Sequence, residues 1–174
     1  MKKIIVALAV FIAGFSAEAQ LKTPQSSPKT TIVQSVGLTD VEINYSRPSA
    51  RGRVVFGNLI PFGKVWRTGA NENTTVSFSD DVVIDGKTLK KGKYSLYTIP
   101  KIESWEIIFY KTTDNWGNPA EWKEENVALR TTVKPETLNK KVETFTIGVS
   151  GLDNNFAILE IYWENSYAAL KFEV

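Results

Sequence analysis

Most of the chain after residue 28 alternates between apolar and polar positions, which is the pattern of β-strands that bury one face. Over residues 41–46, for example, valine, isoleucine and tyrosine alternate with glutamate, asparagine and serine. Comparable patterns predict further strands over residues 30–36, 75–79, 82–84, 87–89, 142–150, 156–163 and 167–174. Asp85-Gly86 is a typical two-residue hairpin turn, so the runs on either side of it are expected to pair.

Two further runs, residues 94–99 and 105–110, carry apolar side chains on both faces, which is typical of strands in the middle of a sheet. A proline followed by three glutamates predicts a short helix over residues 119–126. Asn165-Ser166 predicts a turn before the last strand. Many short strands without β-α-β alternation favour an all-β fold, an antiparallel β-sandwich or a closely related barrel, with at most one or two short helices.

The N-terminus has the features of a secretory signal peptide. Two lysines precede an apolar run over residues 4–15, and two alanines follow at the positions that signal peptidase reads. The apolar run is shorter than the roughly 20 residues of a membrane-spanning helix. We therefore predict a signal peptide over residues 1–19 with cleavage before Gln20, a flexible leader over 20–28 and one β-sandwich domain over 29–174. The mature protein is expected to be periplasmic or secreted, without a membrane span.

The composition excludes several kinds of chemistry. The chain has no histidine and no cysteine, which removes Ser-His-Asp triads, thiol catalysis, disulfides and ordinary zinc sites. The acidic loops lack the spacing of an EF-hand, so we expect no metal and no cofactor. The formal net charge of +2 is too small to favour nucleic-acid binding. The core must hold the fold together, and 43% hydrophobic residues are sufficient for that.

One candidate for ligand binding is the arginine-rich segment over residues 45–53. Arg47, Arg51 and Arg53 follow a predicted strand, with a proline and a glycine between them. Guanidinium groups offer a rigid fork of donors that suits carboxylate, phosphate or sulfate. Arg47 continues the inward parity of the strand before it, so its guanidinium must find partners if the strand extends that far. The alternative is that these arginines form surface ion pairs that hold a loop.

The second candidate segment covers residues 64–74 and contains Trp66, Arg67, Asn71 and Glu72. An aromatic ring beside amides and charges is typical of a sugar-binding site, where the ring stacks on the sugar and the polar groups bind hydroxyls. The alternative places Trp66 in the core and pairs Arg67 with Glu72 as a structural ion pair.

Several of these segments resemble a known family. They are Tyr45-Ser46-Arg47-Pro48, Arg51-Gly52-Arg53, Phe56-Gly57, the run from Pro61 to Glu72 and the run from Gly92 to Pro100. The chain resembles, over nearly its whole predicted mature length, the bacterial domain-of-unknown-function 2911 family. The resemblance implies an exported protein of gram-negative bacteria without an established activity, and it supplies no catalytic residues.

The leading hypothesis is a non-catalytic binding module for a small polar or anionic ligand or a glycan. Its site would contain Arg47, Arg51, Arg53, Arg67, Asn71 and Glu72, with Trp66 as a stacking wall. The first alternative is a glycosidase-like hydrolase that uses two carboxylates, with Glu72 as the first candidate. The second is an envelope structural protein without a ligand site. The sequence leaves the oligomeric state open.

Overall fold

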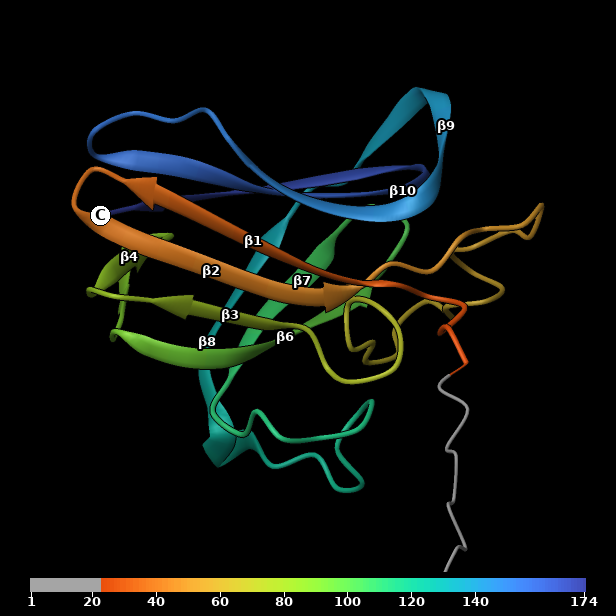
Figure 1. The fold of residues 1–174 in the computed structure, drawn as a ribbon, viewed down its shortest axis with the longest axis horizontal. Coiled ribbons are helices and arrows are strands. Elements are labelled where there is room, and N and C mark those ends of the chain that lie inside the picture. Colours follow the sequence, from red (N-terminus) through yellow and green to blue (C-terminus); the bar gives the residue numbers. More distant parts are fainter. Residues whose placement is uncertain (1–22) are drawn as a thin grey trace, which may run out of the picture.

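The computed structural model describes residues 23–174, which form two antiparallel β-sheets packed together (Figure 1). The six-stranded sheet has the order β1 (Lys29–Val36), β2 (Thr39–Ser46), β3 (Thr75–Phe78), β6 (Gly92–Pro100), β7 (Trp105–Tyr110), β8 (Val127–Val133). The four-stranded sheet has the order β5 (Lys87–Leu89), β4 (Val82–Ile84), β10 (Phe156–Glu173), β9 (Glu136–Ser150). The predicted all-β sandwich is confirmed.

The main core lies between the two sheets and is built from the inward positions of the alternating strands. Tyr45 of β2 meets Phe145 of β9 edge to face, with ring centroids 5.7 Å apart. Phe78 of β3 and Phe172 of β10 make a similar contact at 5.6 Å. Because each pair joins opposite sheets, these contacts fix the sheets against each other in addition to burying apolar area.

A smaller cluster covers the outer face of the six-stranded sheet. Tyr97 of β6 and Tyr110 of β7 are fully buried there, and Trp122 from the loop after β7 packs on both of them. The Tyr97 hydroxyl donates to the carbonyl of Gly117 in the same loop at 3.4 Å. β6 and β7 are therefore buried on both faces, as their double-sided apolar pattern predicts.

The structure differs from the sequence prediction at three places. The helix expected over residues 119–126 is reduced to the 3-10 turn η1 (Glu124–Asn126), because Lys123 is extended (φ −121°) and Trp122 is drawn into the outer cluster. The turn expected at Asn165-Ser166 is absent, since β10 continues through it with register shifts around Glu164 (φ 52°), as in a β-bulge. Strand β8 was not predicted.

The N-terminal predictions lie partly outside the described residues. The signal peptide predicted for residues 1–19 is wholly outside them. Within the leader, Pro28 accepts a hydrogen bond from the backbone N–H of Arg47 at 2.9 Å, just before β1 begins. Among residues 23–174, no helix is long and apolar enough to cross a membrane.

Candidate functional site

The two candidate segments meet at one end of the sandwich. The arginine-rich segment follows the end of β2, and the segment with Trp66 precedes the start of β3. β2 and β3 are antiparallel neighbours, with Asn44 opposite Thr75, so the two loops leave the sheet at the same end. Figure 1 shows this group of loops beyond the head of the β2 arrow. The topology thus brings the predicted residues into one region, although not into one site.

Arg47 is a structural residue that ties the loop after β2 to strand β9. Its Nε donates to the carbonyl oxygen of Phe145 at 3.1 Å, and its Nη2 donates to Thr146 Oγ1 at 2.8 Å. These neutral acceptors give the guanidinium two partners, as the inward parity of Arg47 required. They also leave Arg47 outside both pockets described below, so its predicted role in ligand binding is not supported.

A pocket of about 430 Å³ opens between the two loops and the N-terminal leader. We call it the arginine pocket, because Arg51, Arg53 and Arg67 all line it. Its other polar side chains are the serines Ser26, Ser27 and Ser49. No aspartate or glutamate lies among its described lining residues. The pocket therefore carries uncompensated positive charge within its own walls.

Arg67 is a partly buried arginine whose side chain has no partner among residues 23–174. Its side chain forms no hydrogen bond or ion pair with any of residues 23–174, and its Nε is buried. The guanidinium lies close to Gly117, where a Cβ atom would come within 3.3 Å of Nη1. Burial lowers the pKa of Arg67 from its ordinary value by disfavouring the charged form, and nearby Tyr97 acts in the opposite direction.

The other two arginines of the pocket differ in how firmly they are held. Arg53 donates from Nε to the carbonyl of Ala50 and from Nη2 to that of Ser49, both at 2.8 Å. These bonds fix its guanidinium and leave the remaining N–H groups for a ligand. Arg51 is exposed, and only its backbone N–H is engaged, by a Glu143 carboxylate oxygen at 2.7 Å.

Trp66 lines the arginine pocket and belongs to the core. It is 4% exposed, and its ring stacks on Trp163 with centroids 5.7 Å apart and an interplanar angle of 22°. The edges of Phe56 and Phe145 close around it, and its indole N–H donates to the carbonyl of Gly69 at 3.0 Å. The expectation that Trp66 is a stacking wall is therefore not met, because core rings cover it.

Asn71 and Glu72 turn away from the arginine pocket. The Asn71 amide donates to Gln25 Oε1 at 2.9 Å and to the carbonyl of Ser27 at 3.2 Å, which fastens the leader onto the loop. Glu72 lines a different pocket, and the structural ion pair between Arg67 and Glu72 does not form. Asn71 has a left-handed backbone conformation (φ 58°).

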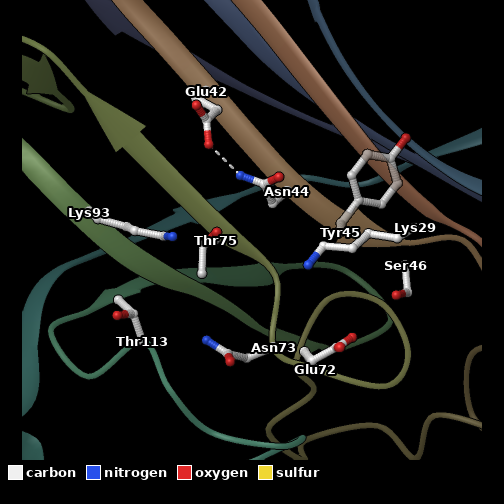
Figure 2. Close-up of a pocket in the computed structure, with 10 residues that line it drawn as sticks. All are labelled: Lys29, Glu42, Asn44, Tyr45, Ser46, Glu72, Asn73, Thr75, Lys93 and Thr113. Carbon is white, nitrogen blue, oxygen red and sulfur yellow. Dashed lines mark hydrogen bonds between the residues drawn. The ribbon is translucent and has the colours of Figure 1, made fainter.

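The second pocket has a volume of about 380 Å³ and lies on the outer face of the six-stranded sheet (Figure 2). We call it the polar pocket. Its lining residues are Lys29, Glu42, Asn44, Tyr45, Ser46, Glu72, Asn73, Thr75, Lys93 and Thr113. Lys29 and Lys93 come from β1 and β6, and neither was among the predicted site residues. Both are brought to the pocket by sheet pairing, which the sequence around them does not reveal.

Two carboxylates, those of Glu42 and Glu72, line different parts of the polar pocket. Figure 2 shows Glu42 at one end of the pocket and Glu72 at the other, near Ser46. Glu42 and Ser46 are four residues apart on β2, which is about 13 Å along an extended strand. A carboxylate pair that acts on one glycosidic bond needs a separation of roughly 5–10 Å. Within residues 23–174, no cluster of acidic residues could hold a metal ion.

The loop over residues 67–74 forms a wall of both pockets. Arg67, Gly69 and Ala70 face the arginine pocket, whereas Glu72 and Asn73 face the polar pocket. Thr68 within it is buried and has a left-handed backbone (φ 54°), which is rare for a β-branched residue. The Thr74 hydroxyl secures this conformation by donating to the Thr68 carbonyl at 2.6 Å.

A comparison with family models gives one match. The model described as "Protein of unknown function (DUF2911)" covers residues 27–172, which confirms the resemblance seen in the sequence. No curated protein and no solved structure matches the chain significantly.

Proposed function

We propose that this chain, which belongs to the DUF2911 family of proteins of unknown function, is a non-catalytic binding protein for a small anionic ligand. The observation that carries the proposal is that Arg67, whose partly buried side chain has no hydrogen-bond partner within residues 23–174, lines a pocket together with two further arginines. Burying a charge without a partner costs free energy, so a fold that keeps one is expected to gain an acceptor from elsewhere. An anion bound in the arginine pocket would be that acceptor.

The donors of the pocket suit a carboxylate or phosphate group. Arg53 is held in place by two backbone carbonyls, so little side-chain entropy is lost when its free N–H groups bind an oxyanion. The exposed side chain of Arg51 can adjust its position to the ligand, and the serine hydroxyls can bind the remaining oxygens of the ligand. A volume of about 430 Å³ is in the range of small-molecule sites.

The same pocket does not favour a sugar or a hydrolytic reaction. Trp66 offers no free face for stacking, which removes the main argument for a glycan. None of the described residues lining the pocket is a carboxylate, and the chain has no histidine or cysteine, so the pocket lacks an ordinary general acid or base.

We further propose that binding takes place outside the cytoplasm. The support is the charged, apolar and small-residue order of residues 1–19, which is that of a secretory signal peptide. Absence of cysteine is compatible with an oxidising compartment, because no thiol can form a wrong disulfide there.

Calorimetric titration of the purified chain with phosphate, succinate and citrate tests the proposal. We expect at least one of these anions to bind, and Arg67→Met to weaken its binding by at least tenfold, which corresponds to about 1.4 kcal/mol. Arg130→Met is the matched control, because Arg130 pairs with Glu124 at 3.0 Å and does not line the pocket. Absence of binding to all three anions, or equal affinity in Arg67→Met, would contradict the proposal.

A further inference from the structure

Three residues that line the polar pocket expose little of their surface and keep side-chain oxygens that have no hydrogen-bond donor among residues 23–174. Ser46, Asn73 and Thr75 are 2%, 6% and 6% exposed. The Asn73 amide donates to Ser95 Oγ, whereas its Oδ1 accepts no hydrogen bond from the described residues. The hydroxyls of Ser46 and Thr75 likewise make no side-chain hydrogen bond within residues 23–174. These oxygens are not among the buried polar atoms without a partner, so they remain accessible to a polar ligand in the pocket.

The rim of the same pocket carries two charges of each sign. None of Lys29, Lys93, Glu42 and Glu72 takes part in an ion pair with the described residues. Other lysines of the described chain do pair, as Lys90 does with Asp81 at 2.8 Å. Figure 2 shows the two ammonium groups directed toward the middle of the pocket from opposite sides, with the carboxylates at its ends.

From this arrangement we infer that the polar pocket binds a small zwitterion of the amino-acid type. The ligand's carboxylate would lie between the ammonium groups of Lys29 and Lys93. Its ammonium group would lie at the end of the pocket that Glu72 lines. Glu42 is less available, because its carboxylate already accepts a hydrogen bond from Asn44 at 2.6 Å.

Other ligand classes fit the pocket less well. A pure anion would meet two carboxylates and a pure cation would meet two lysines, so each would experience repulsion as well as attraction. A neutral sugar would find no aromatic platform, because the Tyr45 ring is buried and its hydroxyl bonds to the backbone of Ile147. Only a ligand with both charges uses both halves of the rim.

This site is independent of the arginine pocket. The two pockets share no lining residue, although the loop over residues 67–74 separates them. Their charge also differs, because the polar pocket is balanced and the arginine pocket is positive. Loss of zwitterion binding can therefore be told apart from loss of anion binding.

The test is a titration of the purified protein with glycine, L-glutamate and L-lysine, monitored by calorimetry or by amide chemical shifts. Acetate and methylamine serve as half-molecule probes that carry only one of the two charges. We expect at least one amino acid to bind at least tenfold more tightly than either half-molecule. Equal binding of amino acid and half-molecules, or no amino-acid binding at 10 mM, would overturn the inference.

Substitutions at the rim complete the test. Glu72→Gln and Lys93→Gln should each weaken amino-acid binding at least fivefold. Lys91→Gln and Glu103→Gln, which alter exposed charges outside the pocket, should leave it unchanged. Arg67→Met should also leave it unchanged. Unaltered affinity in both rim variants, with circular dichroism like that of the parent, would overturn the inference.

Discussion

Replacing Arg67 by methionine is expected to stabilise the fold while removing the anion site. The side chain of Arg67 makes no hydrogen bond with residues 23–174, and its buried Nε leaves a donor unsatisfied. An unsatisfied buried donor destabilises a protein by about 1–3 kcal/mol. Methionine has a similar length and no donor, so it keeps most of the packing against Gly117. Allowing for some lost contact, we expect the free energy of unfolding to rise by about 1 kcal/mol.

Arg47→Met is the matched comparison, because Arg47 has the same side chain in a structural role. Its guanidinium donates two hydrogen bonds to strand β9, at 3.1 and 2.8 Å. Hydrogen bonds from charged donors contribute about 1.5–3 kcal/mol each, and the Phe145 carbonyl would lose its partner. We therefore expect Arg47→Met to lower the free energy of unfolding by about 3 kcal/mol. The free energies of unfolding of the two variants should therefore differ by about 4 kcal/mol, with Arg67→Met above the parent and Arg47→Met below it.

Urea and thermal unfolding, followed by circular dichroism in a buffer without phosphate, measure this difference. For a chain of this length, 1 kcal/mol corresponds to a shift of about 2–4 °C in Tm. An anion that binds should raise the Tm of the parent and leave that of Arg67→Met unchanged. If Arg67→Met instead loses as much stability as Arg47→Met, then Arg67 is a structural residue and the argument from its missing partner fails.

Two further predictions concern other parts of the chain. The pKa of Tyr162 is raised to about 12, first because burial disfavours the tyrosinate and then because Glu160 is nearby. The free energy of unfolding should therefore fall as the pH rises from about 10 to 12. In a titration followed by tyrosinate absorbance, Glu160→Gln should lower the pH at which this tyrosine is half ionised. Ionisation of all six tyrosines together would contradict the prediction. Protein recovered from gram-negative cells should begin at Gln20 by intact mass, and a retained N-terminal segment would refute the signal peptide.

The sequence predicted the fold well where local patterns and tertiary packing agree. In β2, every second residue faces the core, so alternation alone indicates both the strand and its buried face. Asp85 and Gly86 take the positive φ values, 51° and 69°, that their hairpin turn requires. Where tertiary contacts decide, prediction failed. Trp122 packs on Tyr97 and Tyr110 of the sheet, and no local sequence signal reveals that this contact keeps its segment from forming a helix.

The candidate site was predicted in its residue types and only partly in its geometry. Arg51, Arg53 and Arg67 do line one pocket, because antiparallel pairing brings the two loops to the same end of the sandwich. Glu72 lines the other pocket, one residue after the left-handed backbone conformation of Asn71. An asparagine permits this conformation, but its presence in the sequence does not predict it. The lysines of the polar pocket come from strands far apart in sequence, so their meeting follows only from sheet order.

The loop over residues 67–74 combines two features that lower stability, and this points to function at its faces. Thr68 holds a left-handed backbone conformation that costs about 1–3 kcal/mol for a β-branched residue. Arg67 next to it has a buried donor without a partner. A loop that served only to connect β2 and β3 could avoid both with glycine at one position and an apolar residue at the other. Retaining both is understandable if this conformation is what presents Arg67 to one pocket and Glu72 to the other, since a relaxed loop would place these side chains differently.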